Sequence, residues 1–284
     1  MDMKPTIFKT ITAAFFAFVA VSDGLRADQE FCVFDNGLTD IKSAEKQASL
    51  LQKLGYDGIC TRPGHATDEL FAAMDHHGIR ISASYVVLPA LDYQAPLSPG
   101  LTEHIRKLKG RKTIVWLAIT QPEAEDEAAV TVIRKACDLA AENGLDVALY
   151  PHVGMKTGNT STCERLRKLA DRPNLGLSFN LCHFLCENDA AGLEATLKSV
   201  APHLKLVQIS GADAIPPGKP DWRRLIQPLG QGTFDMRRVF RTLDEIGYKG
   251  PVNLQCYQIK QPASQHLAAS MTAWQTRNNN HLNP

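Results

Sequence analysis

Two histidines and one arginine stand directly after apolar segments, where their side chains are available for chemistry. His152 follows LDVALY, His183 lies three residues after Asn180 in LSFNLCHFL, and Arg62 follows GICT. An unperturbed imidazole titrates at about pH 6.5, so both histidines are candidate proton carriers. A guanidinium keeps its charge and donates several hydrogen bonds, which suits a developing oxyanion. We therefore predict that these three residues are catalytic: the two histidines move protons, and Arg62 binds the developing oxyanion.

A second set of side chains is predicted to bind the substrate: Asp35, Tyr150, Asn180, Asp213, Gln255 and Trp222. Amide and phenol groups recognise hydroxyl groups, and Asp213 has the chemistry to orient an imidazole or a hydroxyl group of the ligand. Trp222 either covers an apolar face of the ligand or anchors its loop, and anchoring is the preferred interpretation. Taken singly, each polar residue is equally explained as a helix cap or a loop contact. Taken together, they indicate a ligand pocket.

The chain after residue 28 alternates short apolar segments with amphipathic ones eight times. The predicted strands are 30–35, 57–64, 79–88, 112–120, 145–152, 174–184, 204–213 and 250–259. The predicted helices are 43–56, 67–78, 100–110, 125–144, 163–172, 189–201, 235–248 and 262–277. Regular strand and helix alternation implies parallel pairing with right-handed crossovers.

Eight such units in residues 28–284 predict an α/β fold with one domain, a single (β/α)8 TIM barrel. The alternative is an open doubly wound sheet, but no glycine-rich phosphate turn follows the first strand. A barrel places its active site at the carboxyl ends of its strands. The candidate residues above all follow predicted strands, so we expect them to line one mouth.

The composition favours a small, weakly charged ligand. Lysine and arginine number 31, aspartate and glutamate 30, and like charges do not cluster, which argues against a nucleic-acid partner. Residues 1–27 combine Lys4 and Lys9 with the apolar stretch 11–22 and the small Ala27, a pattern typical of a signal peptide. The stretch is too short to span a bilayer comfortably. We expect export to the periplasm or beyond, with a buried N-terminal helix as the alternative.

Seven cysteines give no zinc-finger spacing. Their number is odd, so at least one thiol stays free in a monomer. Several lie inside apolar segments, where cysteine acts as a small hydrophobic residue. No disulfide is assigned, and the oligomeric state is left open.

Segments 51–59, 175–184, 206–213 and 228–255 resemble the sugar phosphate isomerase/epimerase group, the xylose isomerase-like TIM barrels. The resemblance covers the chain after residue 28 and is strongest from Leu175 to Gln255. Its most specific part is the loop with Gly230 and Gly232 before a helix, followed by GYKGPV. This resemblance implies a sugar or sugar derivative as substrate.

The resemblance also implies a divalent metal held by glutamate, aspartate, histidine and glutamate at four strand ends. This chain has Tyr150, Asn180, Ser210 and Gln255 there, and Cys60 where a further glutamate is common. Magnesium and manganese prefer anionic oxygen ligands. No metal ligand or cofactor is therefore predicted. The alternative is a transition metal at His152, His183 and Asp213, because zinc accepts imidazole readily.

Three functions remain open at this point. The first is a sugar isomerase or epimerase that moves protons through His152 and His183. The second is a lyase or hydratase acting on keto-sugars or glycosides, where the carbonyl acidifies the neighbouring C–H bond. The third is a barrel that binds carbohydrate without converting it.

Overall fold

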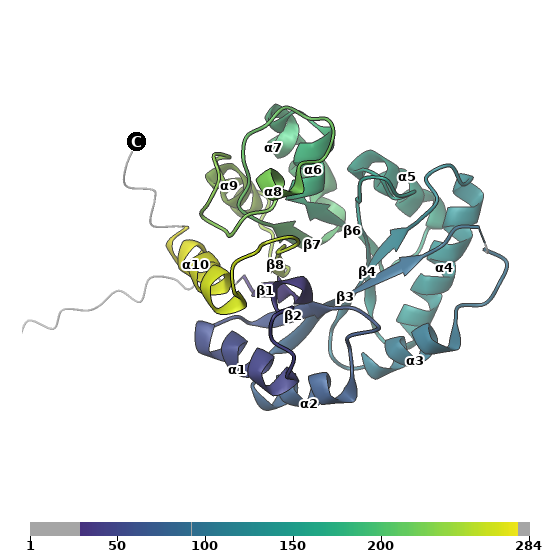
Figure 1. Ribbon diagram of the computed structural model, residues 1–284. Helices are drawn as coiled ribbons and strands as arrows, with labels where there is room; N and C mark the ends of the chain where they lie inside the picture. The colour runs from purple at the N-terminus through teal and green to yellow at the C-terminus, as the bar shows by residue number, and fades with distance from the viewer. Residues whose placement is uncertain (1–28, 92, 278–284) are drawn as a thin grey trace, which may run out of the picture.

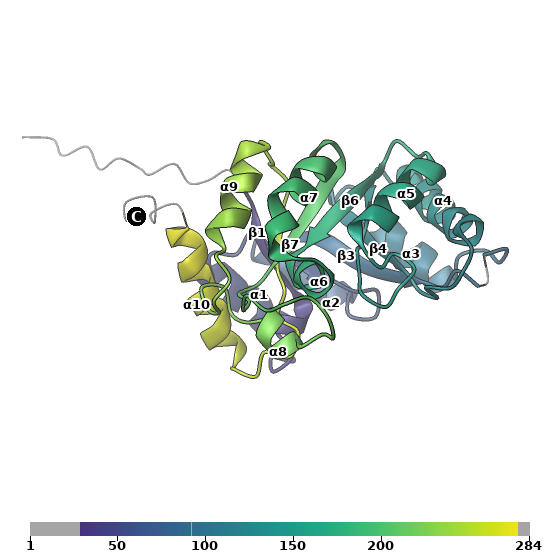
Figure 2. The ribbon, with the colours of Figure 1, turned by 90° about the horizontal axis from the view of Figure 1, so that it is seen from above.

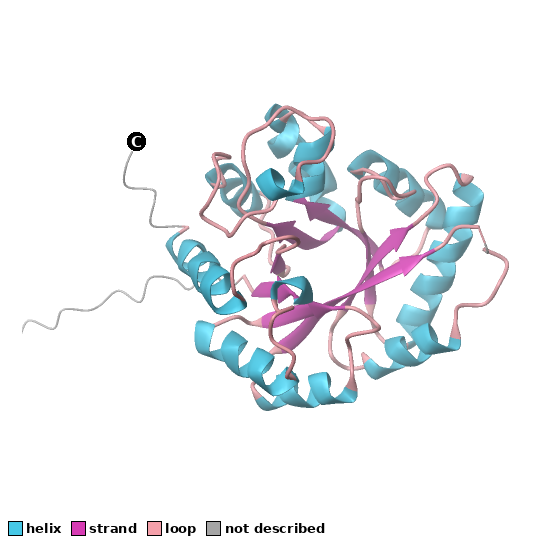
Figure 3. Ribbon diagram, viewed as in Figure 1, coloured by secondary structure: helices cyan, strands magenta, loops and turns pink. Residues whose placement is uncertain are grey.

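The eight predicted strands form one closed parallel barrel, in the order β1 to β8 around the ring. This is seen in a computed structural model, which describes residues 29–91 and 93–277. Helices surround the strands on the outside (Figure 1), and colouring by secondary structure separates the two layers (Figure 3). The predicted single (β/α)8 barrel is confirmed, whereas the predicted signal peptide at residues 1–27 lies outside the described residues.

The strands are short and the helices vary in length. The strands are β1 (Phe31–Phe34), β2 (Gly58–Thr61), β3 (Arg80–Leu88), β4 (Ile114–Ile119), β5 (Asp146–Leu149), β6 (Leu175–Asn180), β7 (Leu204–Ile209) and β8 (Val252–Leu254). The α-helices are α1 (Ala44–Leu54), α2 (Asp68–His76), α3 (Pro99–Lys107), α4 (Asp126–Glu142), α5 (Thr160–Ala170), α6 (Leu181–Glu187), α7 (Leu193–Val200), α8 (Trp222–Leu225), α9 (Arg237–Glu245) and α10 (Ala263–Thr276). Three short 3-10 turns are η1 (Asp35–Gly37), η2 (Ala190–Gly192) and η3 (Ala201–His203).

Helix α1 shows how local sequence sets these boundaries. Ser43 accepts a hydrogen bond from the backbone N–H of Lys46 at the start of the helix. Gly55 follows its last residue with φ of 84°, a left-handed conformation that glycine adopts without strain. Ala48 and Leu51 face the barrel and are fully buried. The N-cap, the terminating glycine and the apolar face of α1 therefore agree with the helix predicted at residues 43–56.

Aromatic side chains fill the inside of the barrel. The rings of Trp116 and Tyr150 stack with their centroids 3.8 Å apart, and Phe34 meets Trp116 edge-on at 5.7 Å. Tyr85 completes the group, 5.4 Å from Tyr150. Burying one such ring contributes about 1.5–3 kcal/mol, so this cluster stabilises the strand ends that carry the site.

The predicted sixth strand is too long. The sequence suggested a strand through residue 184, but β6 ends at Asn180 and α6 begins at Leu181. The Asn180 side-chain oxygen accepts hydrogen bonds from the backbone N–H groups of Cys182 and His183, which caps the helix. His183 consequently sits on the first turn of a short helix and not on a strand.

The segment between β7 and α9 folds back over the mouth of the barrel. Ser210 Oγ donates to the carbonyl of Leu225, and Gly211 pairs with Gln227 in an isolated antiparallel bridge. The short helix α8 lies beside α6 in both views (Figures 1 and 2). A segment expected to be a plain loop is thus fixed by backbone pairing at its base.

All seven cysteines are buried thiols in this fold. Within residues 29–91 and 93–277, the helices are all too short or too polar to cross a membrane.

Gly232 should be irreplaceable, because the loop backbone approaches it closely. A Cβ atom at Gly232 would lie 2.1 Å from the carbonyl oxygen of Ala212, and its φ is +90°. We expect Gly232→Ala to destabilise the fold by about 1–3 kcal/mol beyond the cost of left-handed strain alone. Urea unfolding followed by circular dichroism measures this difference. The matched control is Gly144→Ala, where φ is +68° and no atom lies within 4 Å; equal losses for the two variants would contradict the prediction.

Candidate active site at the barrel mouth

Five of the predicted site residues meet at one side of the barrel mouth. Tyr150 follows β5, Asn180 ends β6, His183 lies in α6 and Trp222 begins α8. The ring centroid of His152 lies 4.2 Å from that of His183 and 5.0 Å from that of Tyr150. The carboxyl ends of β5 and β6 and the segment covering them therefore create one cluster of proton-bearing groups.

The Asn180 amide is fixed by the helix that it caps. Its Oδ1 accepts from the N–H groups of Cys182 (3.1 Å) and His183 (3.4 Å), so only Nδ2 faces the other strand ends. Nδ2 donates to Tyr150 Oη and to Gln208 Oε1, both at 3.0 Å. The side chain thus presents N–H donors to the site, and its oxygen is committed to the backbone.

His183 is held as a neutral imidazole with both nitrogens occupied. The backbone N–H of Val153 donates to Nδ1 at 3.2 Å, which requires a bare Nδ1 and therefore assigns the proton to Nε2. Nε2–H then donates to Tyr150 Oη at 3.0 Å. The residue is only 5% exposed. Burial, with a smaller effect of the neighbouring His152, lowers the pKa of His183 well below its ordinary value.

His152 has the opposite arrangement and leaves one nitrogen for chemistry. Its Nδ1 donates to the carbonyl of Val153 at 2.9 Å, so Nε2 carries a lone pair. Among the described residues, Nε2 has no hydrogen-bond partner. Burial lowers the pKa of His152, although the bond to Val153 opposes the shift. A neutral, basic imidazole nitrogen is the result.

Tyr150 connects these groups. Its Oη accepts from both His183 and Asn180, so its own O–H is directed to a third group. The side chain is 2% exposed, and burial raises its pKa well above the ordinary value for tyrosine. Tyr150 is therefore a neutral phenol whose O–H proton is used in neither of these bonds.

Gln255 and Ser210 complete the four strand-end positions, and both are committed to the fold. Gln255 Oε1 accepts from Asn36 Nδ2 (2.6 Å) and from the backbone N–H groups of Cys256 and Tyr257. Ser210 is fully buried and donates to the Leu225 carbonyl. Neither side chain offers a free oxygen to a ligand.

These four positions do not fit the divalent metal that similar barrels imply. The amide oxygens of Asn180 and Gln255 accept backbone or side-chain N–H groups, and Tyr150 Oη accepts two N–H donors. A hard cation requires oxygen acceptors, of which carboxylates are the strongest. Asn180 Nδ2 and His183 Nε2 donate to partners within the site, so the Tyr150 O–H is the donor left to complement a carbonyl or oxyanion.

Arg62 lies at the end of β2 and is paired with Asp35. Its Nη2 is 2.8 Å from Asp35 Oδ1 and its Nε is 3.3 Å from Oδ2. His65 Nδ1 lies 3.1 Å from the same carboxylate, and the guanidinium carbon lies 5.5 Å from the centroid of Phe34. The Arg62 side chain is about one-third exposed, so part of its guanidinium group still faces solvent at the rim.

Asp213 has a structural position. Its Oδ2 pairs with Arg224 Nε at 2.9 Å, and its Oδ1 accepts from the backbone N–H of Thr233. The structure does not bring it together with His152 and His183 as a metal site. Within the described parts of the chain, the one close group of three histidine, cysteine or acidic residues is Glu45, His76 and His77.

Trp222 touches the site edge-on. Its ring centroid lies 5.1 Å from that of His183 in a T-shaped arrangement. Beside it, a groove of about 440 Å³ is lined by Lys219, Pro220, Asp221, Trp222, Arg223 and Gln258. Trp222 therefore both packs over His183 and borders open space at the mouth.

Three further residues contribute to the site: Asn36 and Tyr85, which the sequence places at strand ends without a specific role, and Gln208, which sequence reasoning missed. Burial raises the pKa of Tyr85 to about 12, so it adds a neutral phenol beside Tyr150. Asn36 orients Gln255, and Gln208 receives an Asn180 N–H while being fully buried. The available signal for Gln208 was its spacing in β7, two residues before the strand-end residue Ser210.

Residues 48–275 match the model of a protein family described as xylose isomerase-like TIM barrel. An inosose dehydratase of Klebsiella pneumoniae is 32% identical over 125 residues, which cover 39% of this chain and 41% of that protein. The chain thus spans about two fifths of the length of this curated relative.

Two solved structures share the fold. A structure of IolI protein with a binding zinc atom has a TM-score of 0.67 and 18% identity, covering 90% of this chain and all of that one. A D-allulose 3-epimerase from Methylomonas sp. has a TM-score of 0.69 and 16% identity, covering 88% and 98%. At these identities, the likeness concerns the fold alone.

Asn180→Asp should destabilise the protein, because aspartate caps α6 but removes both inward N–H donors. Tyr150 Oη and Gln208 Oε1 would face a buried carboxylate, at a cost of about 1–3 kcal/mol. The free energy of unfolding in urea at pH 7.5 measures the loss.

The matched control is Asn159→Asp. Asn159 caps α5 through the Thr162 N–H and is half-buried, so aspartate should leave the free energy of unfolding within about 0.5 kcal/mol of the parent. If Asn180→Asp were as stable as Asn159→Asp, the inward-donor arrangement would be wrong.

Proposed function

Because the chain belongs to the xylose isomerase-like TIM barrel family, we propose that it is an enzyme acting on a sugar or cyclic polyol that carries a carbonyl group. The proposed step removes the proton from the carbon beside that carbonyl. His152 is the base, and the hydrogen-bond donors of the mouth stabilise the resulting enolate. The inosose dehydratase match supports this class of substrate and reaction.

One observation carries the proposal: His152 presents a bare Nε2 while its partner His183 does not. His183 uses Nδ1 for the Val153 N–H and Nε2–H for Tyr150. The sequence suggested two equivalent proton carriers, but this geometry favours one base and one positioning residue. His183 acts through Tyr150, whose O–H it directs toward the substrate.

A single base favours elimination of water. His152 Nε2 takes the proton from the carbon beside the carbonyl, and the C–H electron pair forms the enolate. The enolate electrons then expel the hydroxyl group on the next carbon, and the imidazolium returns its proton to it, so that water leaves. The elimination requires no oxidant or reductant, and His152 returns to the neutral imidazole with which it began.

The charge of the enolate needs compensation at the mouth. Arg62 supplies a permanent cation at the rim. Asp35 pairs with only part of its guanidinium group, and the rest is available to the substrate. The Tyr150 O–H supplies a neutral donor within the cluster of imidazoles. Buried donors of this kind stabilise developing charge more strongly than water does, because they do not reorganise. The partly exposed ring of Tyr85, which packs against Phe34 and Trp116, suits the apolar C–H face of a sugar ring.

Isomerisation is the second candidate, favoured by the same His152 nitrogen. One base on one face of the substrate is sufficient to carry a proton between adjacent carbons through an enediolate. Epimerisation at one carbon by two bases requires proton carriers on both faces, and His183 does not provide the second.

Replacing His152 should remove proton transfer. His152→Asn keeps a donor for the Val153 carbonyl but deletes Nε2, so we expect kcat to fall about 10²–10⁴-fold. The measurement is deuterium uptake from heavy water into a panel of inososes, ketoses and keto-glucosides, with mass detection of products that have lost water.

The matched variant His183→Asn keeps an acceptor for the Val153 N–H and should reduce turnover less than His152→Asn. His203→Gln, at η3 and away from the mouth, should leave turnover unchanged. Saturable sugar binding without deuterium uptake or water loss would refute the enzyme proposal in favour of a binding protein.

The pH dependence of kcat/KM should show the lowered pKa of His152. A base acts in its neutral form, and burial keeps His152 neutral to lower pH than a free imidazole. The acidic limb of the profile should therefore fall below pH 6.5, with activity retained as pH decreases through 6.5. A limb centred above pH 6.5 would contradict the assignment of His152.

A further inference from the structure

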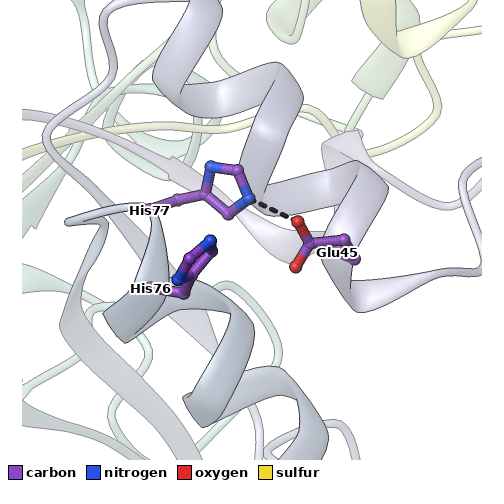
Figure 4. Close-up of side chains that lie close together, drawn as sticks. All are labelled: Glu45, His76 and His77. Carbon is purple, nitrogen blue, oxygen red and sulfur yellow. Dashed lines mark hydrogen bonds and ion pairs between the residues drawn. The ribbon is translucent and has the colours of Figure 1, made fainter.

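A second group of metal-ligating side chains lies on the outside of the barrel, between α1 and α2. Glu45 is in the first turn of α1, and His76 and His77 close the last turn of α2. One ligand atom from each residue lies within 4.8 Å of the other two. The three side chains converge in Figure 4, where His77 is joined to Glu45.

His77 is already oriented as metal-binding histidines are. Its Nδ1 lies 2.8 Å from Gln52 Oε1, and Gln52 Nε2 donates to the His77 carbonyl at 3.1 Å. The second contact fixes the amide so that its oxygen faces Nδ1, which must then carry a proton. A ligating histidine typically donates its other ring N–H to such an oxygen, leaving Nε2 for the metal.

His77 Nε2 points at a carboxylate. Its distance to Glu45 Oε1 is 2.7 Å, and the bond to His77 lowers the pKa of Glu45. Nδ1 and Nε2 of His77 thus each face an acceptor oxygen. A divalent cation bound at Nε2 takes the place of this contact and binds the same carboxylate.

His76 supplies the third ligand. Its ring centroid is 5.1 Å from that of His77, and the two rings are nearly perpendicular. Tetrahedral zinc places its ligand atoms about 3.3 Å apart, given bonds of about 2.0–2.1 Å. The exposed side chains of His76 and Glu45 can close this gap by rotation, whereas His77 is only 12% exposed and stays fixed.

The neighbouring carboxylate of Asp75 does not compete. Both of its oxygens bind Arg111, at 2.6 and 2.8 Å. A donor set of two imidazoles and one carboxylate suits zinc and similar transition metals rather than magnesium or calcium.

We propose that Glu45, His76 and His77 form a zinc site that ties α1 to α2, separate from the barrel mouth. The ion binds Nε2 of His77, one nitrogen of His76 and a carboxylate oxygen of Glu45, with solvent completing its coordination. Its role is to stabilise the pairing of these two helices.

The test uses full-length protein without an affinity tag, stripped with EDTA and titrated with zinc chloride by calorimetry. One zinc ion per chain should bind outside the mouth. At a free zinc concentration about 100 times the dissociation constant, the melting temperature should rise by roughly 5–10 °C. His77→Gln and Glu45→Gln should each weaken zinc binding at least tenfold, and Gln52→Leu should weaken it about 10–100-fold.

Two control variants locate the ion. His203→Gln and His152→Asn should both retain the zinc equivalent and the rise in melting temperature. The variants are compared first in EDTA, where an unchanged melting temperature shows that each one is folded. Zinc binding that survives His77→Gln, or that disappears in His152→Asn, would overturn the proposal, as would the lack of any zinc-dependent rise in the parent protein.

Discussion

The bond between the Asn180 oxygen and the start of α6 is the constraint on which the barrel mouth depends. A side chain that ends a strand and caps the next helix has its acceptor committed to the backbone. Its N–H groups must then face inward, to Tyr150 and Gln208. The same cap sets the position of His183 on the first helical turn, within reach of Tyr150 and the Val153 N–H.

This constraint changes the electrostatics of the whole site. Carboxylates at the same strand ends would create a cage for a cation, whereas Asn180, Gln255 and Tyr150 are neutral and arranged around N–H donors. The two charged groups at the rim, Arg62 and Asp35, compensate each other. What remains is a neutral, largely buried environment in which an imidazole stays uncharged and an oxyanion is stabilised by hydrogen bonds.

The architecture and most of the residues at the mouth could be predicted from the sequence. Ser43 and Gly55 mark the ends of α1, and the polar residues after each strand identify the rim. The helix α6 was missed, because its apolar residues continue those of β6 and only Asn180 signals the change. The different states of His152 and His183 were not predictable either. His152 meets the Val153 carbonyl, one residue along the chain, whereas His183 meets the Val153 N–H, a contact between segments 30 residues apart. The pairing of Asp213 with Arg224 likewise depends on how the segment after β7 folds back.

The central claim is that the mouth holds two neutral imidazoles of opposite tautomeric form. Long-range ¹H–¹⁵N correlation spectroscopy of protein labelled at histidine, with His152 and His183 assigned by substitution, tests this directly. The account predicts that His152 carries its proton on Nδ1 and His183 on Nε2, with both neutral at pH 6.5. A His183 signal that titrates near pH 6.5, or a His152 ring protonated on Nε2, would contradict it.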